Sequence, residues 1–318
     1  MTQPDVSILI VAYNAAESLS DCLESLAGSG KPVSSSEIIV VDNASEPSLV
    51  GLIERYVGRS QVIRLDENIG FGRACNLAAS RSTGRNILLL NPDTIAHSGA
   101  IDTLLTAVRE VENAGMVGGR TVTPSGDHDP RSCWGEPTMW SQLCFATGLS
   151  RLLKGNSVFD PESLGDWKRD TVRDVPVVTG CLALVPRNAW SAVGGFDMDY
   201  FMYGEDADLS KRLRRSGLRV WIEPGSVVTH VVGASSPNSG AKTTLLLAGR
   251  VTYLRKNFSV KEFHVARMLL TVGVAWRALG AGLLRRRDAG WLVAWRQRRQ
   301  WLNGYPPYNG VDQSVPHF

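Results

Sequence analysis

Three acidic side chains, Glu205, Asp206 and Asp208, lie within four positions of the sequence, directly behind the aromatic stretch 200–203. Carboxylates of this kind take up protons, bind metal ions, or complement the positive amino-terminal end of a helix. The last explanation is structural and applies to any acidic first turn, and Gly204 is a suitable residue at which to begin a helix. The cluster therefore needs a closer look before any chemistry is assigned to it.

Helical geometry distinguishes the acids. At about 100° per residue, Asp206 lies on the same face as Leu209 and Leu213. Asp208 lies with Arg212, four residues later, which is the usual arrangement of an exposed, ion-paired face. A carboxylate on an apolar face is costly to bury unless it is hydrogen-bonded or functional. The spacing thus gives Asp208 a structural explanation and leaves Asp206 as the candidate for chemistry.

The elements that must position this acid alternate along the chain. Short apolar runs rich in Val and Ile predict buried strands at 6–12, 37–42, 61–65, 86–91 and 116–121. Helical patterns lie between them at 16–27, 47–57, 72–80 and 99–114. This alternation predicts an α/β fold with an open, mostly parallel sheet flanked by helices.

Polar residues follow three of the predicted strands. The segments are Ala12-Tyr13-Asn14, Asp42-Asn43 and Asn91-Pro92-Asp93. In an open α/β sheet, ligands bind beyond the carboxyl ends of the strands. Asp and Asn also suit ordinary turns, but three polar strand ends at one edge of one sheet favour a ligand site.

A glycine-rich turn, Asn68–Asn76 (NIGFGRACN), precedes one of the helices. It nearly matches the dinucleotide fingerprint GxGxxG, but Cys75 stands in place of the last glycine and the turn follows the third strand instead of the first. We therefore exclude a nicotinamide cofactor. Such a turn can still bring the backbone close to a phosphate or a sugar. Neither a GxxxxGK[ST] phosphate loop nor a GxSxG nucleophile elbow is present.

The second half of the chain is less regular. We predict a loop-rich insertion at 124–174, a strand at 175–185, a short helix near 187–193, strands at 218–224 and 226–233, and a closing helix at 243–257. His230 lies in the last strand among valines, where a lone histidine is typically a hydrogen-bonded core residue. The five cysteines are scattered without a CxxC pair, which favours a reducing cytoplasm over disulfides or a zinc site.

The net charge of +3 conceals a division within the chain. Residues 242–318 carry 13 basic and 3 acidic residues, whereas residues 1–241 carry 21 basic and 28 acidic residues. Within 265–303, tryptophans stand beside arginines, and the longest uncharged run, 268–276, is far short of the roughly 20 residues that a spanning helix needs. We predict helices that lie in a membrane interface. Packing on the body of the protein or on a second copy is the alternative, and no nucleic-acid-binding module is present.

Seven segments, taken in order, resemble family 2 of the inverting glycosyltransferases, which has the GT-A nucleotide-sugar fold, and more closely its rhamnosyltransferase-like branch. They are SILIVAYN, IIVVDNAS, ENIGFGRACN, LLLNPDT, TGCLALVPR, GGFDMDYFMYGEDADLSKR and the late His230. Each is weak alone, but their order over some 225 residues, from about Val6 to His230, is specific.

The resemblance implies roles for particular residues. It places Glu205-Asp206 at the general-base motif, with Asp206 as the base. It places Asp93 and His230 as ligands of a divalent metal ion, Mg²⁺ or Mn²⁺, with Asn91 standing where the family's Asp-x-Asp motif has its first Asp. The residues implied to bind the nucleotide-sugar donor are Ala12, Tyr13, Asn14, Asp42, Asn43, Gly70, Phe71, Gly72, Asn76 and Asn91.

The resemblance also implies the reaction. We expect one displacement that inverts the anomeric carbon and moves a sugar, with L-rhamnose from deoxythymidine diphosphate-rhamnose preferred, to a glycan or polyprenyl-linked acceptor in cell-surface polysaccharide synthesis. A UDP-hexose donor and a catalytically silent sugar-binding scaffold are the alternatives. We expect a cytoplasmic protein at the inner face of the cell membrane, without nucleic acid, and leave homo-oligomerisation open.

The expected domains follow from the same motifs. Residues 1–241 form the catalytic domain, divided into a nucleotide-sugar-binding half (1–123), the insertion (124–174) and an acceptor half (175–241). Residues 242–318 form a basic, Trp- and Arg-rich helical extension.

Overall fold

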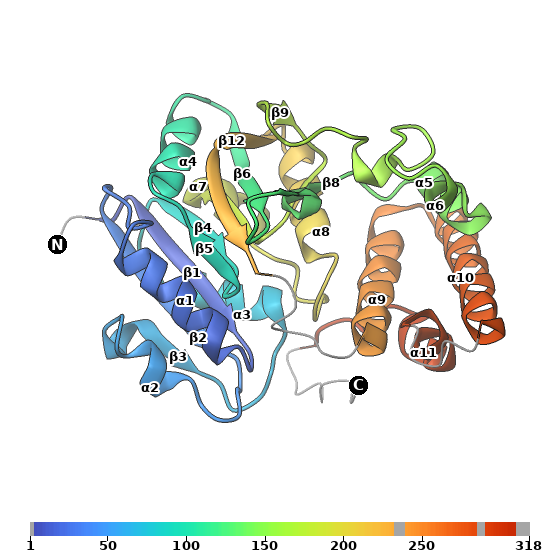
Figure 1. The fold of residues 1–318 in the computed structure, drawn as a ribbon, viewed down its shortest axis with the longest axis horizontal. Helices are drawn as coiled ribbons and strands as arrows, with labels where there is room; N and C mark the ends of the chain where they lie inside the picture. The colour runs from blue at the N-terminus through green and yellow to red at the C-terminus, as the bar shows by residue number, and fades with distance from the viewer. Residues whose placement is uncertain (1–2, 232–238, 285–289, 310–318) are drawn as a thin grey trace. The chain divides into compact units, whose positions relative to one another are not determined.

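A computed structural model describes residues 3–231, 239–284 and 290–309 (Figure 1). The chain divides into two compact units. Unit 1 comprises Met1–Trp134, Lys168–Asp197 and Asp206–Ser235, and unit 2 comprises Gly135–Trp167, Met198–Glu205 and Ser236–Phe318.

Unit 1 is built on a mixed sheet that is ten-stranded over the described residues, and eight of its strands follow the order β3-β2-β1-β4-β11-β6-β12-β5. The other two strands lie off this path, where β7 pairs with β6 and β9 pairs with β12. The strands are β1 (Val6–Ala12), β2 (Ser36–Asp42), β3 (Val62–Arg64), β4 (Asn86–Leu90), β5 (Thr94–Ala96), β6 (Ala114–Val122), β7 (His128–Asp129), β9 (Arg173–Asp174), β11 (Leu182–Pro186) and β12 (Arg219–His230). A separate ladder joins β8 (Cys133–Trp134) to β10 (Val177–Val178). Strands β1 to β4 are parallel, and β11 enters antiparallel between β4 and β6.

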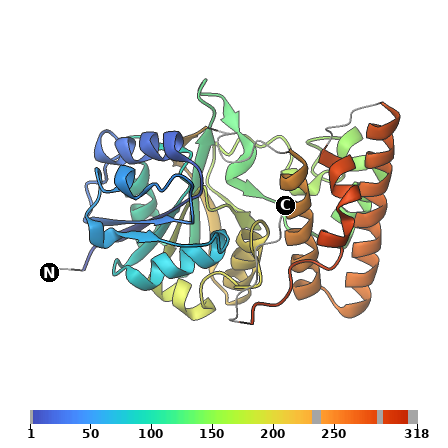
Figure 2. The same cartoon turned by 90° about the horizontal axis from the view of Figure 1, so that it is seen from below.

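Helices cover both faces of this sheet. They are α1 (Ala16–Ala27), α2 (Val50–Ile53), α3 (Phe71–Arg81), α4 (Ala100–Arg109), α7 (Arg187–Val193) and α8 (Glu205–Arg215), with 3₁₀ turns at Arg59–Gln61 and Pro130–Ser132. Figure 2 shows α1 (blue) on one side of the sheet and α3 (light blue) on the other. The expectation of an α/β sheet flanked by helices is confirmed.

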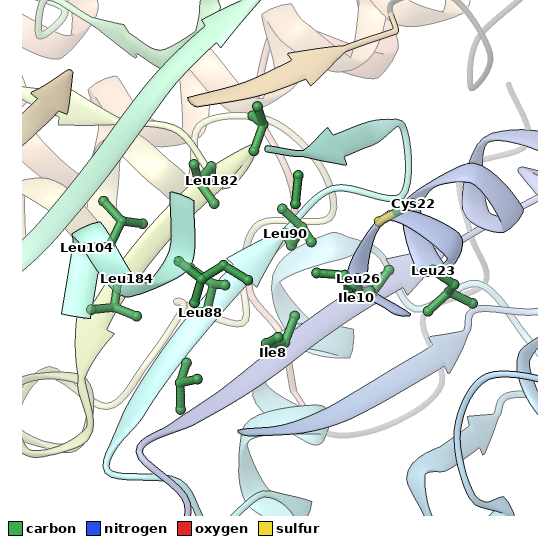
Figure 3. Packing of buried hydrophobic residues seen from close by; sticks show 14 of the residues in the cluster. Ile8, Ile10, Cys22, Leu23, Leu26, Leu88, Leu90, Leu104, Leu182 and Leu184 are labelled. Atoms are coloured by element: carbon green, nitrogen blue, oxygen red, sulfur yellow. The ribbon is translucent and has the colours of Figure 1, made fainter. Parts of the chain in front are cut away.

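The main core lies between the sheet and helices α1, α2 and α4 (Figure 3). Alternate residues of β1, Ile8 and Ile10, point into this core, as the two-residue period of a strand requires. Leu23 and Leu26 of α1 and Leu104 of α4 meet them from the helical side. Each such side chain contributes about 1.5–3 kcal/mol when it is fully buried, so the core fixes the strand ends that carry the polar residues.

Several predicted elements differ in extent. The helix expected at 47–57 is only one turn, α2, because beyond Ile53 the amides of Arg55 and Tyr56 bond three residues back, as in tighter turns. The strand expected at 175–185 is broken at residues 179–181 into β10 and β11. The two strands expected at 218–224 and 226–233 are one strand, β12, with a bulge between Glu223 and Val227.

Unit 2 is helical. It contains α5 (Met139–Thr147), α6 (Leu149–Leu152), α9 (Ser239–Asn257), α10 (Val260–Leu283), α11 (Gly290–Arg296) and α12 (Arg298–Trp301), with a 3₁₀ turn at Pro161–Ser163. The guanidinium of Arg277 lies over the ring of Phe145, 3.8 Å from its centroid, and near Trp276 and Trp291, so a buried cation stacked on aromatic rings joins α5, α10 and α11. None of the described helices is both long enough and apolar enough to cross a bilayer.

A glycine in α9 permits one close approach within unit 2. A Cβ built at Gly249 would lie 1.8 Å from the carbonyl oxygen of Tyr203, so only glycine lets this turn approach α9. Tyr203 and Gly204 both have positive φ. The aromatic stretch before the acidic helix is therefore fixed by the helices of unit 2.

The two units divide the chain differently from the expected domains. Residues 135–167, expected to be part of an insertion within the catalytic domain, cluster with the C-terminal helices. The expected boundary at 241/242 lies inside α9. The arginine cluster 285–287 of the expected basic extension and its last residues, 310–318, fall outside the described residues.

Candidate active site

Pairing between β5 and β12 brings two of the predicted metal ligands together. Thr94 pairs with His230 across this antiparallel ladder, and the amide of Val231 donates to the carbonyl of Asp93. As a result, Oδ1 of Asp93 lies 3.4 Å from Nε2 of His230. That Oδ1 is buried and makes no hydrogen bond within the described part of the chain.

The other side of His230 faces a third residue, Asp129. Oδ2 of Asp129 lies 3.2 Å from Nδ1 of the imidazole, and its Oδ1 accepts from Nε of Arg131 at 2.6 Å. Burial alone would lower the pKa of His230, but its interactions with the carboxylates of Asp129 and Asp93 outweigh burial and raise the pKa to about 12. Burial would raise the pKa of Asp129, yet His230 and Arg131 hold it at about 2. The imidazole thus lies between two carboxylates.

These residues fit a divalent cation. A carboxylate oxygen and an imidazole nitrogen are ordinary ligands for such ions, and two ligands on adjacent positions of an octahedron at about 2.1 Å lie about 3 Å apart. The 3.4 Å between Asp93 and His230 is close to that spacing. Across the described ranges, no group of three or more His, Cys, Asp and Glu side chains could hold a metal ion. Further ligands would have to come from elsewhere, such as a bound donor or water.

The candidate base, Asp206, is the second residue of α8. Leu209 and Leu213 are buried on the same face of this helix, as predicted. The amide of Gly180 donates a hydrogen bond to its carboxylate. Burial raises the pKa of Asp206 to about 6, and this one hydrogen bond offsets only part of that effect. Its Oδ1 is buried and, among the residues the structure describes, has no hydrogen-bond partner.

The break between β10 and β11 joins these features. A Cβ at Gly180 would lie 3.1 Å from the ring of Phe71, in the glycine-rich turn, and 3.4 Å from Oδ1 of Asp206. The next residue, Cys181, has its sulfur 3.4 Å from Nδ2 of Asn91 and 4.0 Å from Nε2 of His230. Two consecutive residues of unit 1 therefore connect the base, the donor turn and the metal pair.

The sheet register assembles the predicted nucleotide edge. Ala12 pairs with Asp42 across β1 and β2, and Ile10 pairs with Leu90 across β1 and β4, so the three polar strand ends lie side by side. Of the residues predicted there, Tyr13 and Asn14 are exposed, whereas Ala12 and Asp42 are fully buried.

Several predicted donor-binding residues hold the backbone of the site. Asp42 accepts from the amides of Ser45 and Leu49 and from Arg64 at 2.7 Å. Asn43 holds the glycine-rich turn, since its Oδ1 accepts from the amide of Ile69. These contacts make Asp42 and Asn43 positioning residues, and their contact with a donor stays a prediction.

The remaining predicted donor residues lie around the same turn. Asn76 is bonded through its amide to the backbone of Phe196, with Nδ2 donating to the carbonyl oxygen at 2.8 Å and Oδ1 accepting from the amide nitrogen. Gly70 has positive φ at the start of α3, and Gly72 is buried in the first turn of that helix. Phe71 is half-buried. Asn76 is thus fixed to the protein, whereas Phe71 faces Gly180 in the site.

Comparisons with known proteins give the family of this chain. The model of the family described as Glycosyl transferase family 2 matches residues 7–164 of the 318-residue chain. The chain belongs to glycosyl transferase family 2. A relative from Mycobacterium tuberculosis, N-acetylglucosaminyl-diphospho-decaprenol L-rhamnosyltransferase, is 27% identical over 252 residues, covering 70% of this chain and 75% of the relative. This relative places the glycosyltransferase in the rhamnosyltransferase-like branch.

Solved structures support the fold. A mannosyltransferase from Pyrobaculum calidifontis, in complex with GDP-Man and Mn²⁺, aligns with a TM-score of 0.56 at 17% identity over 95% of this chain and 86% of that one. GalNAc-T7 with UDP, GalNAc and Mn²⁺ aligns with a TM-score of 0.53 at 14% identity over 80% of this chain and 51% of that one. The GT-A fold expected for this glycosyltransferase is confirmed.

The other two acids of this cluster, Glu205 and Asp208, have structural contacts that differ from those of Asp206. Asp208 is buried, not exposed as the spacing predicted; it accepts from Nε of Arg212 at 2.6 Å, and Arg212 also donates to the carbonyls of Val193 and Gly195. This ion pair ties α8 to the turn after α7. Glu205 belongs to unit 2, where it is buried and adds to the effect of burial in raising the pKa of Tyr305.

Sequence reasoning missed three residues of the site in this glycosyltransferase, Asp129, Gly180 and Cys181. Asp129 precedes a proline and resembles an ordinary turn residue, while Gly180 and Cys181 lie inside an apolar run that predicts a continuous strand. The one available signal was the TG pair that interrupts this run, because a glycine within a strand often marks a close approach of another group.

Substitution of Gly180 by alanine tests how tightly the site is built. Since the new Cβ would press on the ring of Phe71 and approach Asp206, we expect transfer to fall about tenfold with little change in melting temperature. Steady-state kinetics and a thermal melt measure both quantities. Full activity of this variant would show that the space between Phe71 and Asp206 is not used.

Proposed function

We propose that this glycosyltransferase transfers L-rhamnose from deoxythymidine diphosphate-rhamnose to a hydroxyl of a polyprenyl-linked or other glycan acceptor, with inversion at the anomeric carbon. The name of the mycobacterial relative, which specifies an L-rhamnosyl group and a lipid-linked N-acetylglucosaminyl acceptor, supports this choice. A second relative, an O-antigen biosynthesis protein of Myxococcus xanthus, is 24% identical over 234 residues but spans far more than this chain, which covers 18% of it. It supports a place in surface polysaccharide synthesis.

The observation that carries the proposal is the state of Asp206. Its carboxylate has a buried oxygen without a hydrogen-bond partner in the described structure, and its pKa is raised to about 6 by burial. Catalytic bases are commonly tuned toward neutral pH in this way. A carboxylate with only a structural role would be satisfied, as that of Asp42 is.

The chemistry follows from this carboxylate. Asp206 takes the proton of the acceptor hydroxyl as that oxygen forms a bond to the anomeric carbon, and the bond from this carbon to the donor diphosphate breaks on the opposite face. One such displacement inverts the configuration without a protein nucleophile. The proton passes from Asp206 to solvent after the product leaves.

Asp93 and His230 are the residues that would hold a divalent metal ion, Mn²⁺ or Mg²⁺. When bound, the ion would neutralise charge on the diphosphate leaving group. Asp129 keeps the Nδ1 side of His230 occupied, so that Nε2 faces Asp93. Mn²⁺ in the neighbouring mannosyltransferase and GalNAc-T7 structures supports a metal here.

A thermal-shift panel of the purified protein tests the donor. Deoxythymidine-, uridine- and guanosine-diphosphate sugars are each added with and without Mn²⁺ or Mg²⁺. A ligand well above its dissociation constant raises the melting temperature by mass action, and we expect the largest shift with deoxythymidine diphosphate-rhamnose plus metal. A larger shift with a UDP-hexose would show that the donor is a UDP-hexose instead. No shift with any nucleotide sugar would support a catalytically silent scaffold instead.

A polyprenyl-linked acceptor is embedded in a membrane. We therefore also propose that the protein works at the inner face of the cell membrane, in peripheral contact through residues 265–303. The basic excess of residues 242–318 supports this contact, because the cytoplasmic leaflet carries anionic lipids.

A further inference from the structure

Exposed apolar side chains are concentrated in unit 2. Of the eighteen large apolar side chains that are exposed among the described residues, fourteen lie in this smaller unit. The other four are Tyr13, Val33, Trp134 and Val172. Isolated surface hydrophobics are normal, but a concentration on one unit marks an interaction surface.

Helix α10 carries the most regular part of this surface. Six of its large apolar side chains are between 44% and 76% exposed, and at about 100° per residue all of them except Val260 project within an arc of about 60°. The residues within this arc are Val265, Met268, Val272, Leu279 and Leu283, which we call the outer face of α10. The opposite side of the helix is buried in the core of unit 2.

The outer face contains no charge over its whole length. Between Val265 and Leu283, a distance of about 27 Å along the helix, the charged residues are Arg267 and Arg277. Arg277 is buried on aromatic rings, and Arg267 lies over the ring of Phe263. A helix that faces water would carry polar residues there.

The charges around the outer face favour lipid over a second copy of the chain. After Glu262, α10 contains no acidic residue, and the sequence continues from Leu284 directly into Arg285–Arg287. A second copy would bring the same basic excess, whereas anionic headgroups complement it. The residues that flank the outer face, Leu269 and Trp276, are also uncharged, unlike the charged flanks that direct pairing in coiled coils.

A second group of exposed apolar side chains in unit 2 also stands beside basic residues. Leu152 and Leu153, at the end of α6, are both exposed and stand between Arg151 and Lys154. This turn follows α5, which packs along α10 with Phe145 against Gly273. Leucines flanked by cations are typical of segments that enter the headgroup region of a bilayer.

We propose that the outer face of α10, together with Leu152 and Leu153, docks on an anionic lipid bilayer with the helix axis parallel to the membrane plane. The proposal names the contact surface within residues 265–303 and adds α6 to it. It rests on the proposed function in one respect, namely that a polyprenyl-linked acceptor is itself held in a membrane.

Vesicle flotation of the full chain tests this docking. We expect the protein to float with vesicles that contain phosphatidylglycerol in phosphatidylcholine, less with phosphatidylcholine alone, and less again at high salt. The double variant Val272→Glu, Leu279→Glu puts two carboxylates on the outer face and should lower the partition coefficient for the anionic vesicles at least tenfold. The matched control, Val33→Glu, changes an exposed valine of unit 1 and should bind as the wild type does.

The other outcomes are distinct. Equal loss in Val33→Glu, or an unchanged partition coefficient in the double variant, would overturn the assignment of the surface. Light scattering that shows a stable dimer, dissociated by the double variant, would assign the outer face to a second copy instead. A thermal melt confirms that each variant is folded before it is compared.

The nucleotide-sugar panel keeps this test separate from the proposed function. A wild-type protein that binds a nucleotide sugar but never floats would overturn the docking and leave the donor assignment standing. A protein that floats through the outer face but binds no nucleotide sugar would support the docking surface and overturn the proposed function.

Discussion

Replacement of Asp206 by asparagine is expected to lower sugar transfer by about 10² or more while the fold and donor binding persist. The amide cannot take the proton from the acceptor hydroxyl, and general-base catalysis contributes about 10²–10⁴ to rate. The variant should be at least as stable as the wild type at pH 7.5, because it no longer buries an ionised carboxylate with a single hydrogen bond. The turnover rate, the thermal shift with the nucleotide sugar and the melting temperature without ligand measure the three effects.

Asp208→Asn provides the matched control, two residues along the same helix. Asp208 is buried in an ion pair with Arg212, so its loss should lower the free energy of unfolding by about 1–3 kcal/mol. Transfer per folded molecule should change less than tenfold. The two variants thus have opposite signatures, and near-normal turnover in Asp206→Asn would refute the assignment of the base.

The same carboxylate sets a pH dependence. Because burial raises the pKa of Asp206 to about 6, the ionised, proton-accepting form is lost as the pH falls below 6. We expect kcat/KM to fall about tenfold between pH 7.5 and 5. Asp206→Asn should lack this acidic limb. A wild-type profile that is flat over this range at saturating metal would show that another group takes the proton.

The local sequence pattern was enough to predict those helices and strands whose bounds depend only on the residues within them. The bounds of β1, α1 and α7 are those that the sequence predicts, because an apolar run or a helical period within each segment is matched by burial in the structure. The alignment of the strand ends at 12–14, 42–43 and 91–93 was also predictable, since parallel strands share one carboxyl edge.

Contacts made across the sheet were not predictable in the same way. Asp129 reaches His230 because β7 pairs with β6, which lies beside β12, and no local pattern near Asp129 specifies either pairing. The direction in which a side chain points was not predictable from the sequence either. Asp42 and Asn43 lie at the expected edge, but their side chains turn into the protein to hold the loops at Ser45 and Ile69. Sequence position alone cannot distinguish a side chain that holds a loop from one that holds a ligand.

Loss of Asp93 is expected to have the second large effect. Asn91 already stands where the family motif has a first carboxylate, so Asp93→Asn leaves this motif without any anionic ligand. We expect the affinity for Mn²⁺, in the presence of the nucleoside diphosphate selected by the thermal-shift panel, to fall at least 10²-fold, with a similar loss in His230→Ala. Isothermal titration calorimetry measures this affinity without reference to turnover.

The partner of His230 should matter less, but measurably. Asp129→Asn removes the charge that faces Nδ1, and loss of such an outer carboxylate typically costs 10- to 100-fold in metal affinity. Asp127→Asn is the matched control, because Asp127 lies in the same hairpin, is exposed, and its carboxylate accepts a hydrogen bond from the hydroxyl of Ser125. It should bind Mn²⁺ as the wild type does. Unchanged affinity in Asp93→Asn would exclude the metal pair, whereas unchanged affinity in Asp129→Asn alone would leave Asp129 with a purely structural role.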